Sequence, residues 1–120
     1  MMNQIIGLLA DLLDLEKGAI RPESYLVRDL GVESIDFLEL AVSLNEHFKI
    51  PVEDDTLLLR NLRLHLAAAD EAGAAPLQYL AERYLFLPRE RLEEILDDLE
   101  GGPVIQARDL ESYVQWQLTQ

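Results

Sequence analysis

Over most of this chain, apolar residues recur at the spacing of three or four that is typical of amphipathic helices. Residues 3–15 predict a first helix, whose apolar positions are Ile5, Leu8, Leu9, Leu12 and Leu13. Residues 34–48 predict the clearest helix, with a stripe of Leu38, Ala41, Val42 and Leu44 between Ile35 and Phe48. Both segments are therefore expected to bury one face and expose the other.

The connection between these two helices, residues 16–33, is long and unusually apolar for a loop. It contains Pro22 and Gly31, which favour irregular backbone. It also contains several large apolar residues, namely Ile20, Tyr25, Leu26, Val27 and Leu30. A connection with this many apolar side chains is expected to be pinned to a core.

The pattern continues beyond residue 50 and indicates further helices. Acidic residues at 53–55 suit the first turn of a helix, because the helix dipole favours negative charge there. A Leu-rich helix is expected over residues 56–70, although Leu62, Leu64 and Leu66 also fit strand alternation.

Three more helices are expected after residue 76. Two short ones cover residues 77–87 and 88–100, with Pro88 in the first turn of the second. GGP at 101–103 ends that helix, and a last helix covers about residues 107–118. With no convincing set of strands, the expected fold class is all-α, a small helical bundle.

The charge balance narrows the range of partners. A formal net charge of −13 over 120 residues argues against DNA, RNA and anionic lipid, because binding to these relies on Lys and Arg. An acidic surface instead suits electrostatic capture by basic partner proteins. With 49% hydrophobic residues, the chain can build one real core, and it is too short for two comfortable domains.

Little in the sequence indicates chemistry by the chain itself. The absence of cysteine excludes disulfides, thiolate metal sites and cysteine nucleophiles. No Ser/His/Asp set, phosphate-binding glycine loop or metal-ligand spacing is visible, so no catalytic and no metal-binding residue is predicted. The N-terminal stretch lacks a positive leader, and Asp11 and Asp14 interrupt it, which argues against a signal peptide or membrane span. The expected location is the cytoplasm.

Ser34 stands where the helix of residues 34–48 should begin, and two interpretations of it are open. Serine is a preferred N-cap residue, worth about 1 kcal/mol in that position. A full capping box would require Glu or Gln at position 37, where the chain has Phe37, so the capping signal is incomplete. The alternative is that Ser34 is a handle to which another group is attached.

The residues around Ser34 resemble the acyl carrier protein family. In that family a turn of the form D-L-G-x-[DE]-S-[LI]-D carries the serine, and residues 29–36 read DLGVESID. The later family patterns F-x-I-x-[IV]-x-[DE] and D-L-x-x-Y-[IV] correspond to residues 48–54 and 109–114. Two positions depart from the family pattern: Glu33 stands where aspartate is usual, and His47 where an acidic residue is frequent.

The resemblance implies that Ser34 receives 4′-phosphopantetheine from coenzyme A through a phosphopantetheinyl transferase. A phosphodiester there would place negative charge at a helix N-terminus, which favours it by about 0.3–1 kcal/mol. The arm would supply the thiol that the sequence lacks and hold acyl thioesters for fatty-acid or specialised lipid synthesis. The protein itself would then be a carrier and not an enzyme.

The resemblance also implies transient docking on acyl-transferring or lipid-synthesis enzymes with basic patches. The acidic residues that would meet Lys or Arg there are Glu33, Asp36, Glu39 and Glu46. Each of them could equally be part of an ordinary solvated face. Leu38 and Val42 resemble apolar positions that family members present near the arm, or else they pack into the core. Val32 and Phe37 would add apolar contact beside Ser34. We expect a monomer without stable membrane insertion.

Two other functions stay open at this point. One is a carrier from polyketide or nonribosomal-peptide assembly, which shares the mechanism. The other is a protein-interaction module that kept the carrier fold and lost the arm, in which Ser34 is only a cap.

The resemblance covers about residues 3–55 and 104–118, and residues 56–103 have no counterpart in it. We interpret the chain as one acyl-carrier-like domain in which this segment is a helical insertion. The segment is rich in leucine and carries Arg60, Arg63, Arg83, Arg89 and Arg91. A helical pair this apolar must bury its surface, so we expect it to pack on the bundle. It would alter an acyl-chain cavity or a partner surface, or else be a tolerated packing elaboration.

Overall fold

The computed structural model describes all 120 residues and contains seven α-helices and no strand, so the all-α prediction is confirmed. The helices are α1 Met2–Leu13, α2 Ser34–Phe48, α3 Asp54–Leu57, α4 Leu62–Glu71, α5 Pro76–Arg83, α6 Arg89–Asp97 and α7 Ala107–Leu118. Two short 3₁₀ turns cover Lys17–Ala19 and Leu99–Gly101. None of the helices is long and apolar enough to cross a membrane.

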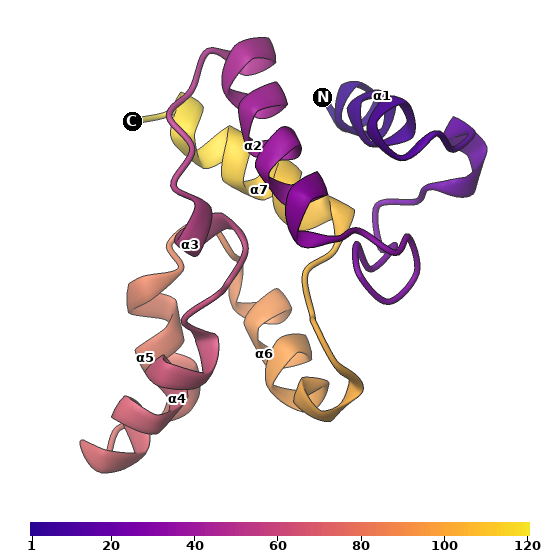
Figure 1. Ribbon diagram of the computed structural model, residues 1–120. Coiled ribbons are helices and arrows are strands. Elements are labelled where there is room, and N and C mark those ends of the chain that lie inside the picture. The colour runs from indigo at the N-terminus through magenta and orange to yellow at the C-terminus, as the bar shows by residue number, and fades with distance from the viewer.

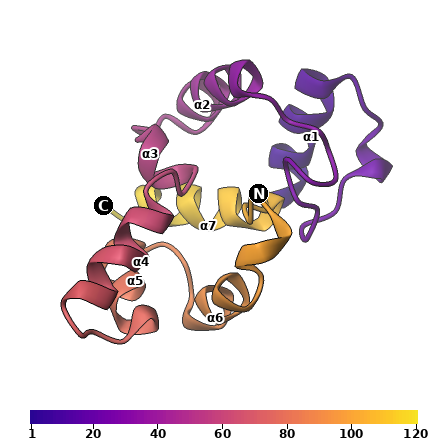
Figure 2. The ribbon, with the colours of Figure 1, turned by 60° about the horizontal axis from the view of Figure 1, so that its bottom comes forward.

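Helix α7 lies between two sets of helices, with α1, α2 and α3 on one side and α4, α5 and α6 on the other (Figures 1 and 2). Tyr113 of α7 contacts both sides. Its hydroxyl accepts a hydrogen bond from the backbone N–H of Glu53 at 2.9 Å, and its ring lies 5.1 Å from that of Phe86. One hydrophobic core therefore joins both sets of helices, and its members include Ile5, Leu40, Leu57, Leu80, Leu92 and Leu110.

The apolar connection between α1 and α2 is held against the core, as its composition predicts. Ile20, Leu26 and Val32 are buried. The backbone N–H of Leu26 donates to the carbonyl of Ile105 at 3.0 Å, and that of Ala107 donates to the carbonyl of Ser24 at 3.0 Å. These bonds fix the connection to the start of α7.

The helix expected over residues 56–70 is instead two helices, because the chain turns between Leu57 and Leu62. Leu59 adopts the left-handed conformation, with φ of 55°. Leu57, Leu59 and Leu62 are all buried. A continuous helix would place positions 57 and 59 on opposite faces, since each residue advances about 100°. The turn therefore lets all three leucines enter one core.

Helices α5 and α6 are shorter than expected because the chain between them packs inward. Tyr84, Phe86 and Leu87 are buried in this connection, while Leu85 faces solvent. Pro88 is the N-cap of α6 and not a residue of its first turn. The prediction that the pair of helices over residues 76–100 packs on the bundle is confirmed by these buried residues.

A buried ion pair joins α6 to α7. Arg91 donates to the two carboxylate oxygens of Asp109 at 2.8 and 3.0 Å and to the carbonyl of Val104 at 2.6 Å. The same carboxylate accepts the backbone N–H of Gln106 at 2.9 Å, at the start of α7. Asp109 therefore caps its own helix and anchors the neighbouring one.

Candidate functional site

Ser34 is the first residue of α2, and it does not cap the helix. The N-cap residue is Glu33, whose backbone N–H donates to the side chain of Asp36 at 2.9 Å. The Ser34 side chain is exposed, and its hydroxyl makes no hydrogen bond within the protein. The interpretation of Ser34 as the cap is therefore wrong: the capping pair is Glu33 and Asp36, one residue earlier than a Ser34–Phe37 box.

The backbone around Ser34 suits a group with negative charge. The N–H groups of Ser34 and Ile35 have no acceptor within the chain, whereas that of Asp36 faces the Glu33 side chain in the capping box. The first backbone bond of the helix runs from Phe37 N–H to the carbonyl of Glu33 at 3.1 Å. Free N–H groups and the dipole of a 15-residue helix favour an anion at this end.

A short turn sets where Ser34 stands. Gly31 has a φ of 69°, a conformation that glycine adopts without steric cost. Just after it, Val32 is buried, and its N–H donates to the carbonyl of Leu26 at 2.9 Å. Ser34 therefore emerges into solvent only two residues beyond a buried anchor.

The outer face of α2 exposes three large apolar side chains. Ile35, Leu38 and Val42 are 63%, 55% and 56% exposed, and their spacing places them on one side of the helix. The buried face of α2 is formed by Leu40, Ala41 and Leu44. The stripe read from the sequence thus mixed two faces, and Leu38 and Val42 lie outside the core.

The apolar side chain nearest in sequence to Ser34 on this face is Ile35, which sequence reasoning had placed at the end of the buried stripe. Val32 and Phe37, which were expected to fill this role, pack inward, with Val32 buried and Phe37 half-buried against the core. The spacing of Ile35 with Leu38 and Val42 was the signal that could have identified it.

The acidic residues predicted from the sequence lie around this apolar face. Glu33, Glu39 and Glu46 are exposed, and Asp36 is half-buried at the cap. None of these four carboxylates takes part in an ion pair within the chain. Glu39 and Glu46 follow Ile35 and Val42 by one helical turn each, so that the negative charges border the apolar residues.

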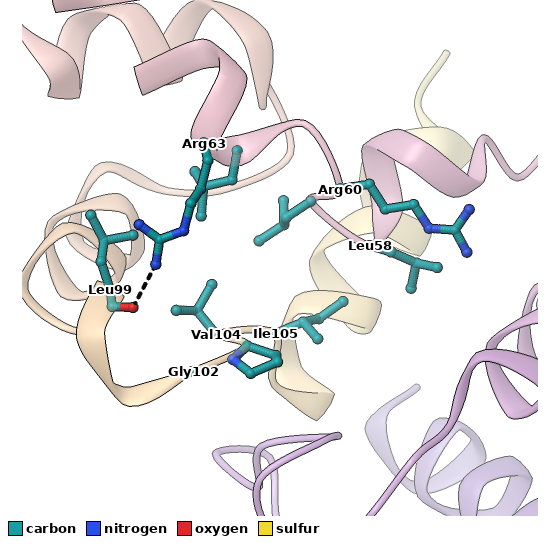
Figure 3. A pocket seen from close by; sticks show the side chains of 10 residues that line it. Leu58, Arg60, Arg63, Leu99, Gly102, Val104 and Ile105 are labelled. Atoms are coloured by element: carbon teal, nitrogen blue, oxygen red, sulfur yellow. Dashed lines mark hydrogen bonds between the residues drawn. The ribbon is translucent and has the colours of Figure 1, made fainter. Parts of the chain in front are cut away.

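Two of the surface hollows, both with largely apolar linings, lie near the segments described so far. One, of about 300 Å³, lies beside the outer face of α2 and is lined by Leu38, Val42 and Val52 among others. The other, of about 330 Å³, lies between the turn before α4 and residues 99–105. Figure 3 shows Arg63 reaching across it to the carbonyl of Leu99, at 3.0 Å, while Arg60 points away. Neither hollow contains a set of groups suited to catalysis.

Comparisons with known proteins find a family match over the part of the chain that contains Ser34. The sequence model of a protein family described as "Phosphopantetheine attachment site" matches residues 3–64, more than half of the chain. The Acyl carrier protein AcpXL of Rhizobium meliloti (strain 1021) is 32% identical over 56 residues, which cover 45% of this chain and 59% of that protein. The Acyl carrier protein of Phytoplasma mali (strain AT) is 40% identical over 55 residues, covering 46% and 66% respectively.

A longer match is found with the Acyl carrier protein AcpXL of Mesorhizobium japonicum (strain LMG 29417 / CECT 9101 / MAFF 303099), 28% identical over 88 residues. It covers 61% of this chain and 95% of that protein. The chain thus spans less than two thirds of the first of these relatives and nearly all of the last. No solved structure matches the chain.

Proposed function

The chain belongs to the acyl carrier protein family, whose cofactor is 4′-phosphopantetheine, and from this premise we propose that Ser34 is its attachment residue. The arm would hold acyl thioesters for enzymes of fatty-acid or specialised lipid synthesis. Its terminal thiol supplies the sulfur that a cysteine-free chain cannot. As in the relatives named carriers, the chain would hold the cargo while other enzymes transform it.

The observation that carries this proposal is the free hydroxyl of Ser34. Because Asp36 accepts the capping hydrogen bond from Glu33, modification of Ser34 costs the helix no bond. A phosphopantetheinyl transferase would join the Ser34 oxygen to the phosphate of the arm, with loss of the hydroxyl proton and release of the nucleotide portion of coenzyme A. The phosphodiester formed would keep one negative charge beside the unpaired N–H groups of the first turn.

We further propose that the transferase and the acyl-handling enzymes dock on the outer face of α2 through basic patches. Exposed Leu38 and Val42 supply apolar contact, and unpaired Glu33, Asp36, Glu39 and Glu46 supply the charge complementarity. Contacts of this kind raise association rates more than they tighten a complex, which suits a shuttle. A monomer in the cytoplasm stays the expected form.

We also propose that residues 56–103 are an insertion within one acyl-carrier-like domain. The family match extends into this segment only as far as residue 64, and the helices beyond that residue share one hydrophobic core with α1 and α7, which supports a single domain. A carrier of polyketide or peptide assembly would use the same serine. Its cargo would distinguish it. The test is to offer the arm-bearing protein straight-chain acyl groups and aminoacyl groups and to compare how much of each is loaded.

The test of the attachment site is the intact mass after incubation with coenzyme A and a broad-specificity phosphopantetheinyl transferase. We expect the wild type to gain one arm and Ser34→Ala to gain none. Ser43→Ala, on the same helix, is the matched control and should gain the arm fully. If folded wild-type protein gained nothing with several transferases, the armless interaction module would replace this proposal.

A further inference from the structure

The residues at the end of α6 and just after it form hydrogen bonds with the loop that leads to Ser34. The carboxylate oxygen Oδ2 of Asp98 accepts hydrogen bonds from the Tyr25 hydroxyl at 2.6 Å and from Arg28 Nη1 at 2.8 Å. Arg28 Nη2 also donates to the carbonyls of Asp98, at 3.1 Å, and Gly102, at 2.8 Å. We call Asp98, Gly101 and Gly102 the brace. Its contacts join residues that are 70 or more positions apart.

Two adjacent glycines make room for this contact. Gly102 has a φ of 108°, a conformation that residues with a Cβ rarely adopt. A Cβ on Gly101 would lie 2.7 Å from Nη1 of Arg28, closer than the two atoms can approach. The Arg28 side chain also lies over the Tyr25 ring, with its guanidinium carbon 4.3 Å from the ring centre. The brace therefore fixes one position of Arg28 and Tyr25 together.

Tyr25 also makes most of the hydrogen bonds that fold residues 25–33, the serine loop, just before Ser34. Its carbonyl accepts the N–H groups of Asp29 and Leu30 at 3.0 and 3.1 Å, and its own N–H donates to the Asp29 side chain at 2.9 Å. The carbonyl of the next residue, Leu26, accepts the N–H of Val32 at 2.9 Å. A connected series of bonds therefore runs from Asp98 through Tyr25 to the anchor two residues before Ser34.

Arg28 also bears on the charge of the site. It is the only Lys or Arg between residues 22 and 48, and it directly precedes Asp29 in the serine turn. The hydrogen bond from Tyr25 and the positive charge of Arg28 hold the pKa of Asp98 below its ordinary value. Asp98 is therefore charged at neutral pH and offsets a cation that would otherwise weaken the acidic field around Ser34.

We propose that Tyr25, Arg28 and Asp98 are positioning residues for the modification of Ser34, so that the segment of residues 56–103 sets the geometry of the attachment turn. This inference rests on the proposed function of Ser34. The bonds of Leu26 to Ile105 and of Ser24 to Ala107 hold the loop to α7 independently. The brace is thus a second restraint, applied close to the serine.

Two variants remove the brace by different means. Asp98→Asn removes the charge that Tyr25 and Arg28 share, and Gly101→Ala displaces the Arg28 guanidinium while both charges remain. Their matched controls are Asp97→Asn, an exposed neighbour with no side-chain partner, and Gly18→Ala, where an added Cβ meets nothing within 4 Å. Each of the four variants is assayed as a substrate of the transferase with coenzyme A, and kcat and KM for arm attachment are measured separately.

We expect Asp98→Asn and Gly101→Ala each to lower kcat for arm attachment by roughly tenfold, since small displacements of a reacting group slow transfer strongly. The double variant should lose no more than either single one, because both remove the same contact. Hydrogen exchange at the amides of Asp29, Leu30 and Val32 should accelerate in both variants and in neither control.

The outcomes separate this inference from the proposed function. If wild-type protein acquires the arm and Asp98→Asn and Gly101→Ala match their controls in kcat and KM, the brace has no positioning role and the inference is overturned. If only KM changes, and only for Asp98→Asn, the brace acts through charge alone and the positioning role is likewise overturned. If the wild type acquires no arm at all, the proposed function fails, and this inference fails with it.

Discussion

The outer face of α2 and the segment containing α4, α5 and α6 use similar residues in opposite ways. On α2, large apolar side chains face solvent, and four carboxylates make no ion pair within the chain. In the segment, most large apolar residues are buried. Four of its arginines are ion-paired, namely Arg60, Arg83, Arg89 and Arg91, and the fifth, Arg63, bonds a backbone carbonyl.

This difference indicates which surface is left for other proteins. Apolar residues exposed together and bordered by charge are typical of interaction sites. Each arginine of residues 56–103 has a partner within the chain, and this segment reaches the site through its contacts with the loop before Ser34. The predictions below test this division, beginning with the largest expected effect.

The buried pair of Arg91 and Asp109 should be the most sensitive contact of residues 56–103. Arg91→Ala leaves a buried carboxylate without its cation, and we expect it to lower the free energy of unfolding by about 3–5 kcal/mol. Arg89→Ala, two residues away on the exposed side of α6, should change it by less than about 0.5 kcal/mol. Urea unfolding followed by circular dichroism measures both. Equal effects would show that the segment is not anchored through this pair.

The two faces of α2 should respond differently to the same substitution. Leu40→Ala opens a cavity in the core and should cost about 2–5 kcal/mol of unfolding free energy. Leu38→Ala should cost less than about 0.5 kcal/mol, because its side chain is already more than half exposed. Leu38→Ala should instead raise KM for the transferase. If it destabilised the protein as much as Leu40→Ala, the outer face would be part of the core.

The helices that bury one regular face were predictable from the sequence. The bounds of α2 and α7 agree with the apolar period, and the acidic residues at 53–55, two of which lie in the first turn of α3, indicated where that helix begins. Ser34 and its turn were identified from a contiguous stretch of eight residues, which needs no information about distant parts of the chain.

Features decided by tertiary contacts were not predictable. Leu59 adopts the left-handed conformation although no glycine in the sequence indicates a turn there. The conformation follows from the burial of Leu57, Leu59 and Leu62 in one core. Leu38 lies three residues from a member of the exposed face of α2 and three residues from a member of its buried face, and Val42 follows Leu38 by four residues. Periodicity alone therefore could not assign these two residues to one face. The pairing of Arg28 with Asp98 spans 70 residues, and no local pattern indicates it.

Tyr84 is a buried polar group of residues 56–103 that lacks a partner, and it gives a smaller test. Its hydroxyl is buried without a hydrogen-bond partner, and burial raises the pKa of Tyr84 from 10.0 to about 12. Tyr84→Phe should therefore increase the free energy of unfolding by about 1 kcal/mol.

The pH dependence of the same variant gives an internal check. Because the folded pKa of Tyr84 lies above the unfolded value, its contribution to stability is complete below pH 10.0 and is lost as the pH rises towards about 12. The difference in unfolding free energy between Tyr84→Phe and wild type should thus grow between those pH values. A constant difference would mean that the pKa of Tyr84 is the same in the folded and unfolded states, so that its hydroxyl is solvated in the folded protein.

The smallest expected effect concerns the carboxylates of α2. Glu39→Lys and Glu46→Lys should leave stability nearly unchanged, since neither residue is paired in the folded chain, and should raise KM for the transferase by about threefold to tenfold. Added salt should shrink that increase, because exposed charges are screened within about 10 Å at 0.1 M. Glu90→Lys makes the same charge change on an exposed, unpaired residue of α6 and isolates the effect of position from that of net charge. An equal rise in KM for Glu90→Lys would mean that partners respond to the overall charge of the protein, and the contrast between the two regions would then rest on the apolar residues alone.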